Sequence, residues 1–351
     1  MRIEELDTPV LIVDLDALEE NLSRYQTYFD EHGIGLRPHI KTHKTLAIAH
    51  MQMARGAIGI ACQKIGEAEV MAAGGVDRDI LIPYNIIGKQ KLSRLTALAR
   101  RTKLTVAADS DHTVDGLSRA AAANGVHIGV VVELYRGRTG VTSPQRAADL
   151  GRKIDALPGL EMRGMMIMPS PPEVRPLIQE TLDCFDRAGL PHPIVSGGST
   201  QCAFTAHEIP EITEHRAGEY PVGGAGHFWA GRHTVEQCAL RVLTTVVSRP
   251  VADRAILDAG SKTMSAVVQA SPEGSRMGHI VEYPDARFSG ASEEHGNVDV
   301  SVCERKPVIG ERVQVLPVHP CPCVNEHDEM VAVREGNVEA VWPIPARGRS
   351  R

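Results

Sequence analysis

The chain has 351 residues and a net charge of −6, with acidic and basic side chains interspersed along it. Aromatic residues make up only 4%, and no basic tract occurs, so a nucleic-acid partner is not expected. No apolar run approaches the roughly 20 residues of a membrane helix, and residues 1–10 lack the apolar region of a signal peptide. We therefore expect a cytoplasmic protein with no membrane partner.

The first predicted helix lies near the N-terminus. Asp16 followed by Glu19 fits a capping box at its start, and Gly33 suits its end. Between these positions, apolar side chains recur at the three- and four-residue spacing of a buried helix face, at Leu18, Leu22, Tyr25 and Phe29.

Strand-like apolar runs then alternate with Ala- and Leu-rich stretches of helix length. The runs are 34–41, 58–63, 79–84, 103–108, 127–134, 160–168, 193–197 and 214–220, and the clearest helices are 89–101, 113–124, 144–157 and 173–189. Strand alternating with helix implies parallel pairing, and eight units predict an α/β fold with a closed (β/α)8 barrel. An open doubly wound sheet is less favoured, because no G-x-G-x-x-G follows the first strand.

The pattern changes near Cys238. Short strand-like runs separated by turn residues follow, at 239–248, 254–258, 279–282, 298–303, 312–318 and 330–342. They predict a C-terminal all-β domain. We place the barrel at residues 10–235 and the β-domain at residues 236–351, together with residues 1–9. The 7 scattered cysteines do not form a disulfide pattern.

The chemistry of such a barrel lies at the C-terminal ends of its strands. The first of these ends carries the letters RPHIKTHK over residues 37–44. Partial desolvation and neighbouring positive charge make a lysine amine in a barrel mouth nucleophilic. The alternative is a basic loop that binds an anion.

The ends of the last two strands are rich in glycine. Residues 196–200 read SGGST and residues 217–220 read AGEY, which offer closely spaced backbone N–H groups and hydroxyls. They indicate a phosphate cradle, although two ordinary glycine turns would have the same composition. A nucleophilic lysine and a phosphate cradle in one barrel mouth are typical of pyridoxal 5′-phosphate (PLP) held as a Schiff base.

A third cluster lies in the segment PVHPCPC over residues 317–323. In an extended chain His319 and Cys321 point the same way and share one metal ion, with positions left for water or substrate. Cys323 is less favoured, because Pro322 redirects the chain. The alternative is a buried cysteine beside a hydrogen-bonded histidine.

Taken together, these segments resemble the D-threonine aldolase/D-serine dehydratase family, whose barrel is of the alanine-racemase type. The resemblance covers nearly the whole chain, including RPHIKTHK, VSGGST, ILDAGSK and PVHPCPC. It implies a homodimer in which Lys41 is the catalytic residue that binds PLP. It also implies further cofactor-binding residues, namely His39, Arg138, Gly197, Gly198, Ser199, Thr200, Gly218 and Tyr220, and two ligands of a divalent metal, His319 and Cys321.

The implied activity is that of a lyase acting on D-3-hydroxy amino acids. The H-x-C pair favours dehydration to a 2-oxo acid and ammonia, and its thiolate favours Zn²⁺ over Mn²⁺ or Mg²⁺. Aldol cleavage to glycine and an aldehyde is the alternative. A racemase and a non-enzymatic cofactor carrier are more remote.

Two segments depart from the family pattern. Residues 166–172 lack the aromatic residue and histidine that relatives carry, and residues 221–231 replace an Asn/Asp-rich segment. His227, in the second segment, is either a catalytic substitute or a loop residue. We expect both segments to affect the choice of substrate.

Overall fold

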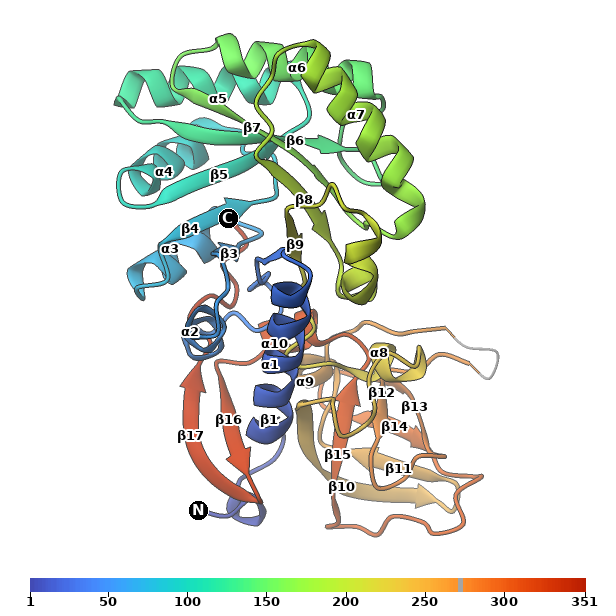
Figure 1. Cartoon of the computed structure of the whole chain (residues 1–351). Helices are drawn as coiled ribbons and strands as arrows, with labels where there is room; N and C mark the ends of the chain where they lie inside the picture. Colours follow the sequence, from blue (N-terminus) through green and yellow to red (C-terminus); the bar gives the residue numbers. More distant parts are fainter. Residues whose placement is uncertain (271–273) are drawn as a thin grey trace. The chain divides into compact units, whose positions relative to one another are not determined.

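The computed structural model describes residues 1–270 and 274–351, and the chain divides into two compact units (Figure 1). The barrel unit contains Arg24–Lys41, Leu46–Gly218 and Arg349–Arg351. The β unit contains Met1–Ser23, Thr42–Thr45 and Glu219–Gly348. Among the helices of the described residues, none is long and apolar enough to span a membrane.

A parallel sheet of eight strands, all within the described residues, forms the barrel unit, in the order β2-β9-β8-β7-β6-β5-β4-β3. Its strands are β2 (Gly35–Leu36), β3 (Ile60–Ala61), β4 (Asp79–Ile82), β5 (Lys103–Ala108), β6 (Ile128–Leu134), β7 (Leu160–Ile167), β8 (Ile194–Gly198) and β9 (Glu214–Arg216). A parallel bridge between His39 and Ala61 brings the continuation of β2 beside β3. The predicted β/α barrel is therefore confirmed.

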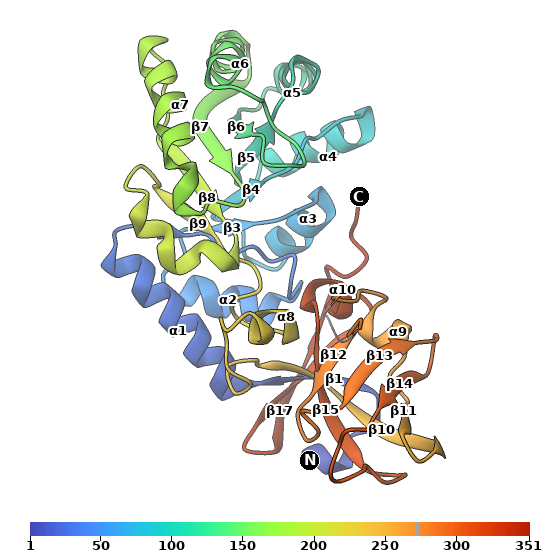
Figure 2. The same ribbon diagram turned by 90° about the vertical axis from the view of Figure 1, so that its right-hand side faces the viewer.

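Helices cover the outer face of this sheet, as Figure 2 shows for α4 to α7. The helical segments are α2 (Leu46–Ala54), α3 (Ile65–Ala73), α4 (Lys89–Ala99), α5 (Asp111–Asn124), α6 (Pro144–Ala156), η2 (Pro172–Val174), α7 (Arg175–Arg187) and η3 (Thr200–Glu208). Local sequence explains where two of them begin. The hydroxyls of Ser110 and Ser143 accept the N–H groups of Thr113 and Arg146 and so cap α5 and α6.

Helix α1 (Leu15–Glu31) buries the predicted apolar face, with Leu18, Leu22, Tyr25 and Phe29 each at most 2% exposed. The predicted capping box was wrong. The Asp14 carboxylate accepts the Ala17 N–H at 3.0 Å, because β1 leads into the helix two residues earlier than predicted. Asp16 forms an ion pair with Arg334 instead.

Nine strands form the sheet of the β unit within the described residues, in the order β11-β14-β13-β12-β15-β10-β1-β16-β17. They are β1 (Val10–Asp14), β10 (Leu240–Val251), β11 (Arg254–Leu257), β12 (Gly278–Ile280), β13 (Arg287–Ala291), β14 (Gly296–Asp299), β15 (Arg312–Pro317), β16 (Glu329–Arg334) and β17 (Asn337–Pro343). Four short helical segments accompany them: η1 (Ile3–Glu5), α8 (Ala225–Trp229), α9 (Ser261–Met264) and α10 (Pro320–Asn325).

The observed division differs from the predicted boundary between residues 235 and 236. Strand β1 lies inside the β sheet, paired with β10 on one side and with β16 on the other. Residues 10–23 and 219–235 therefore belong to the β unit. The strand β1 was not predicted from the sequence, and no local pattern says which sheet a strand joins.

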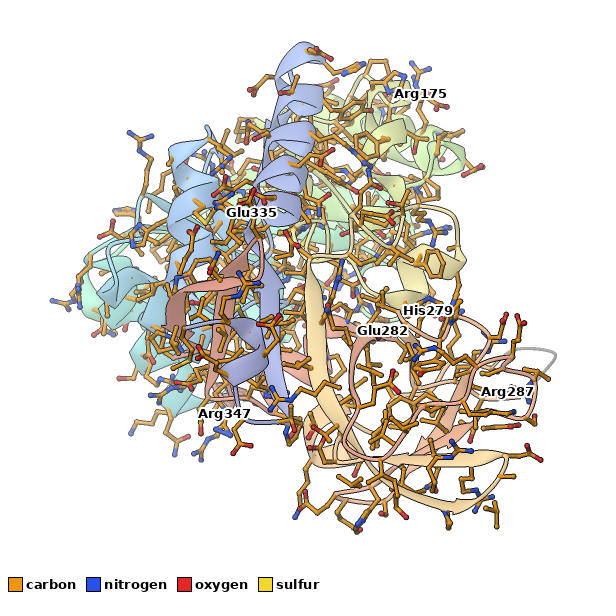
Figure 3. All side chains as sticks on the ribbon, turned by 90° about the horizontal axis from the view of Figure 1, so that it is seen from below. Arg175, His279, Glu282, Arg287, Glu335 and Arg347 are labelled. Atoms are coloured by element: carbon orange, nitrogen blue, oxygen red, sulfur yellow. The ribbon has the colours of Figure 1, made fainter. Side chains whose placement is uncertain are left out.

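Two predicted runs of the β unit differ most from the observed strands. The run 330–342 is a hairpin of β16 and β17, joined by Glu335 and Gly336 with φ of 49° and 74° (Glu335 is labelled in Figure 3). Two consecutive positive φ angles are typical of a type I′ turn, and a glutamate there hides the turn signal. The run 298–303 ends as a strand at Asp299, and β13 was not predicted.

Candidate active site

The predicted PLP lysine follows β2 in the barrel unit. The preceding His39 is 7% exposed, and its Nε2 lies 3.0 Å from Gln63 Oε1. Burial lowers the pKa of His39 well below its ordinary value, and the charge of Lys41 lowers it further, so the imidazole is neutral. Lys41 itself is half-buried, and its backbone N–H points to His39 Nδ1 at 3.4 Å.

The predicted phosphate residues of the barrel unit lie on two neighbouring loops. Gly197 and Gly198 end β8, and the next residue, Ser199, has φ of 99° at the start of η3. The Gly218 N–H after β9 donates to Thr200 Oγ1 at 3.2 Å, which joins the two loops. Tyr220, in contrast, is a buried residue of the β unit.

Ser170 supports this glycine loop and was not predicted. Its hydroxyl accepts the Gly198 N–H at 2.9 Å, and its own N–H donates to the Gly198 carbonyl at 3.1 Å. A Cβ atom at Gly197 would lie 2.8 Å from Ser170 Oγ, so the close approach requires glycine there. Ser170 belongs to the segment 166–172, where the sequence departs from the family pattern.

Arg138, another predicted cofactor-binding residue, lies on the exposed loop after β6. Its Nη2 donates to Met168 Sδ at 3.0 Å. A second arginine, Arg216, is buried in β9 and contacts Ser196 Oγ and the Ile167 carbonyl. Burial lowers the pKa of Arg216 to about 10, which leaves it charged near neutral pH.

Arg37, the first residue of RPHIKTHK, has a structural partner. Its guanidinium donates to both oxygens of Glu214 at 2.8–3.0 Å and to Asp79 at 2.9 Å. Glu214 also accepts the Ser196 hydroxyl at 2.7 Å. Part of the basic segment therefore belongs to a buried ion-pair network and is unavailable for a ligand.

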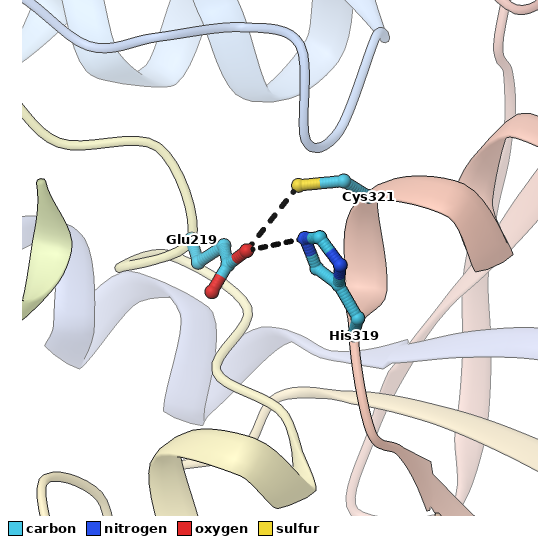
Figure 4. A group of neighbouring side chains, drawn as sticks. All are labelled: Glu219, His319 and Cys321. Atoms are coloured by element: carbon cyan, nitrogen blue, oxygen red, sulfur yellow. Dashed lines mark hydrogen bonds and ion pairs between the residues drawn. The ribbon is translucent and has the colours of Figure 1, made fainter. Parts of the chain in front are cut away.

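The predicted metal ligands lie together in the β unit, with a third group that was not predicted (Figure 4). Glu219 Oε1 lies 2.8 Å from His319 Nε2 and 3.4 Å from Cys321 Sγ. The backbone differs from the expected extended chain. His319 is the extended N-cap of α10, and Cys321 lies in its first turn, because Pro320 starts the helix.

Glu219 is the acidic residue of the AGEY segment, which we predicted to bind the cofactor phosphate. Its side chain lies instead with those of His319 and Cys321, and these three residues are called the metal-ligand cluster below. The available signal was a lone carboxylate at the end of the last barrel strand. Nothing in the local pattern pairs it with a residue 102 positions away.

Hydrogen bonds and charges within this cluster lower the pKa of Glu219 and raise the pKa of His319. Burial raises the pKa of Glu219, but hydrogen bonds from His227 and His319 outweigh it and hold the pKa well below its ordinary value. Hydrogen bonds with Cys321 and Glu219 raise the pKa of His319 to about 10. The Cys321 sulfur also lies 3.1 Å from Thr42 Oγ1.

Two other side chains of the predicted segments, Cys323 and Lys44, form hydrogen bonds outside the metal-ligand cluster. Cys323 is fully buried, burial raises its pKa to about 12, and its thiol donates to the Thr263 carbonyl at 3.3 Å. Lys44 donates to Asn325 Oδ1 at 2.8 Å.

The unusual segment 221–231 packs within the β unit. Its helix α8 places the Phe228 ring 4.8 Å from the His279 ring of β12 (His279 is labelled in Figure 3). It also places His227, which is 4% exposed, against the second oxygen of Glu219. His227 therefore belongs to the surroundings of the metal-ligand cluster.

The residues present fit both groups. Carboxylate, imidazole and thiolate are ligands that Zn²⁺ accepts, and three of them leave a fourth tetrahedral position open. A half-buried lysine beside a neutral histidine, in the same unit as the glycine loops after β8 and β9, fits a PLP site.

Two family models match the chain. Residues 13–225 match "Alanine racemase, N-terminal domain", and residues 239–333 match "Putative serine dehydratase domain". The first match alone covers more than half of the 351 residues.

Curated relatives match over most of their length. The chain is 34% identical to the D-threonine aldolase of Arthrobacter sp, covering 99% of this chain and 95% of the relative. It is 29% identical to the D-threo-3-hydroxyaspartate dehydratase of Delftia sp. (strain HT23), covering 90% of this chain and 91% of the relative.

Solved structures of proteins with these two names superpose on nearly the whole chain. The D-threonine aldolase of Filomicrobium marinum superposes with a TM-score of 0.86 at 32% identity, covering 98% of this chain and 96% of that one. A cysteine-to-alanine mutant of a D-threo-3-hydroxyaspartate dehydratase, in the metal-free form, has a TM-score of 0.87 at 28% identity and covers 98% of each chain. A second mutant of a dehydratase of the same name replaces a histidine two positions earlier.

Proposed function

Because this chain belongs to the alanine-racemase-type family of PLP-dependent lyases that includes D-threonine aldolases and D-threo-3-hydroxyaspartate dehydratases, we propose that it dehydrates D-3-hydroxy amino acids with the help of a divalent metal. The substrate loses its β-hydroxyl as water, and hydrolysis then gives a 2-oxo acid and ammonia. None of the 7 cysteines, all of which lie in the described residues, forms a disulfide, which accords with a reducing cytoplasm.

The metal-ligand cluster carries this proposal. His319 and Cys321 have the same two-residue spacing as the histidine and cysteine replaced in the dehydratase mutants. A thiolate binds Zn²⁺ well, and a Lewis acid assists the loss of hydroxide from Cβ. The expected metal is therefore Zn²⁺.

Each residue has a defined task in the proposed reaction. When bound, PLP supplies an electron sink for charge at Cα and the metal supplies a Lewis acid. Lys41 binds the cofactor through Nζ and takes the proton from the substrate Cα. The loops that contain Gly198, Ser199 and Gly218 bind the phosphate through N–H groups and hydroxyls.

Chain connectivity joins the predicted cofactor residues to the metal-ligand cluster. Lys41 is followed directly by Thr42, whose hydroxyl lies 3.1 Å from Cys321 Sγ. Gly218 is followed directly by Glu219 of the metal-ligand cluster. Two peptide bonds thus link predicted cofactor residues to residues of the cluster.

Aldol cleavage is the second candidate, and a specific observation favours it. The similarity to the Arthrobacter D-threonine aldolase, at 34% identity, exceeds that to the Delftia dehydratase, at 29%. This reaction needs a base for the β-hydroxyl proton, and the segment 166–172 contains no histidine.

The products of D-threonine and of D-threo-3-hydroxyaspartate distinguish these reactions. Dehydration gives 2-oxobutyrate or oxaloacetate, each with ammonia. Aldol cleavage gives glycine with acetaldehyde or glyoxylate, and racemisation gives an L-isomer. Glycine as the main product from both substrates would refute the dehydratase proposal and leave the aldolase. Lys41→Ala should abolish either reaction.

A further inference from the structure

The carboxylate of Glu219 lies where a metal ligand is needed. Its Oε1 is 2.8 Å from His319 Nε2 and 3.4 Å from Cys321 Sγ. Ligand atoms around a tetrahedral Zn²⁺ with bonds of about 2.0–2.3 Å are separated by roughly 3.3–3.8 Å. Shifts well below about 1 Å would therefore bring Glu219 Oε1 and its two neighbours to bonding distance.

The other oxygen of Glu219 has a buried partner. His227 Nε2, on α8, contacts Oε2, and the His227 side chain is 5% exposed. An imidazole that holds one carboxylate oxygen orients the other, which is how residues around metal sites fix their ligands. The neighbouring His233 ring packs against His227 with centroids 5.3 Å apart and limits its rotation.

We propose that Glu219 is a third protein ligand of the metal held by His319 and Cys321, and that His227 is the positioning residue for its carboxylate. This inference rests on the metal site of the proposed function. The three ligands leave one open tetrahedral position, as catalytic zinc sites do. The thiolate and the carboxylate together neutralise a divalent cation, and both increase its affinity.

The test measures metal binding by the PLP-loaded protein after its metal has been removed with a chelator. Zn²⁺ affinity is obtained by competition with a chromophoric chelator, and Co²⁺ reports coordination through its visible spectrum. Glu219→Gln should weaken Zn²⁺ binding by more than about 100-fold and change the ligand-field bands of Co²⁺. The thiolate-to-cobalt band should remain, because Cys321 is intact.

Matched variants separate ligation from folding. Glu293→Gln replaces an exposed glutamate of the same unit and should bind Zn²⁺ like the wild type. Glu219→Asp keeps the charge on a shorter side chain and should give an intermediate affinity. An intact far-ultraviolet circular dichroism spectrum shows that each variant is folded.

The positioning role of His227 has its own readout. His227→Leu should weaken Zn²⁺ binding by about 10–100-fold. His227→Gln, whose amide N–H can replace the Nε2 donor, should recover most of the loss. If His227 only supported the fold, His227→Gln would not be expected to restore the Zn²⁺ affinity.

The outcomes distinguish the dehydratase proposal from the inference that Glu219 is a metal ligand. If Glu219→Gln binds Zn²⁺ as tightly as the wild type, with an unchanged Co²⁺ spectrum, Glu219 is not a ligand, and the dehydratase proposal stands. If the wild type binds no metal, the metal-dependent function and this inference both fail. If His227→Leu retains full affinity, the positioning role is overturned.

Discussion

Two lysines of the segment RPHIKTHK have different surroundings. Lys41 is half-buried after β2, beside the neutral His39. Lys44 is 8% exposed, and its ammonium group donates to Asn325 Oδ1 at 2.8 Å. An amine held in this way is a poor nucleophile, which is consistent with Lys41 as the residue that binds PLP.

Lys41→Ala should therefore abolish the visible absorption of the PLP-loaded protein, because the amine that forms the Schiff base with the cofactor is lost. Lys44→Gln is the control and should keep the yellow colour. An absorption spectrum of each purified variant after dialysis against PLP checks this. A colourless Lys44→Gln with a coloured Lys41→Ala would reverse the assignment.

His215 makes the stability of the protein depend on pH. It is fully buried in β9, where its Nε2 lies 2.9 Å from the Ser199 carbonyl, and burial lowers its pKa from 6.5 to about 4. Between these pH values the unfolded chain binds more protons than the folded one. The free energy of unfolding should therefore fall as pH drops, by up to about 1.4 kcal/mol per pH unit from this group.

His215→Gln should reduce this slope while keeping a donor for the Ser199 carbonyl. Denaturant unfolding between about pH 4 and pH 7 measures the slope of each protein. His39 contributes in the same direction, so part of the slope will remain. Equal slopes for variant and wild type would contradict the assignment.

At the scale of elements, a buried ion-pair network joins β2, β4, β8 and β9 inside the barrel unit. Glu214 of β9 accepts Arg37, which follows β2, and Ser196 of β8, and Arg37 also pairs with Asp79 of β4. Arg37 and Glu214 are each 3% exposed. Removing one partner of such a pair leaves a buried charge without compensation.

Glu214→Ala should lower the free energy of unfolding by about 3–5 kcal/mol. The double variant Arg37→Met/Glu214→Met should lose less, because both charges are replaced by apolar side chains. Chemical denaturation of the single and double variants at neutral pH measures the difference. A double variant less stable than Glu214→Ala would show that the network stabilises the barrel beyond avoiding an unpaired charge.

At the scale of the whole molecule, metal binding should stabilise the fold. The metal-ligand cluster joins the loop after β9 to α10, two parts of the β unit that are distant in sequence. A metal that binds the folded state alone adds about 2.7 kcal/mol at a free concentration of 100 times its Kd.

Chelation should accordingly lower the Tm, and Zn²⁺ should restore it. The double variant His319→Ala/Cys321→Ala should show neither response, since its cluster has lost two ligands. Differential scanning calorimetry with and without chelator makes the comparison. A wild-type Tm insensitive to both treatments would argue against a structural contribution of the metal.

The family resemblance also predicts a homodimer. Light scattering should then give twice the chain mass of 38.0 kDa. A mass of one chain at micromolar concentration would contradict this prediction.

Several features of this protein were readable in the sequence, because they are encoded locally. Alternating apolar runs identified the eight barrel strands, and the spacing of Leu18, Leu22, Tyr25 and Phe29 identified a buried helix face. The segments RPHIKTHK and PVHPCPC, each a few residues long, indicated the candidate lysine and the candidate metal pair.

Other features depended on contacts between distant residues. The strand β1 was not predicted, and its pairing with β10 and β16 placed residues 10–14 in the β unit. Ser170 supports Gly198 from 28 residues away, and Glu219 meets Cys321 across 102 residues. Periodicity reports the surroundings of neighbouring residues in the chain, whereas these contacts arise from how strands and loops pack, so only the tertiary structure could identify Glu219 as a member of the metal-ligand cluster.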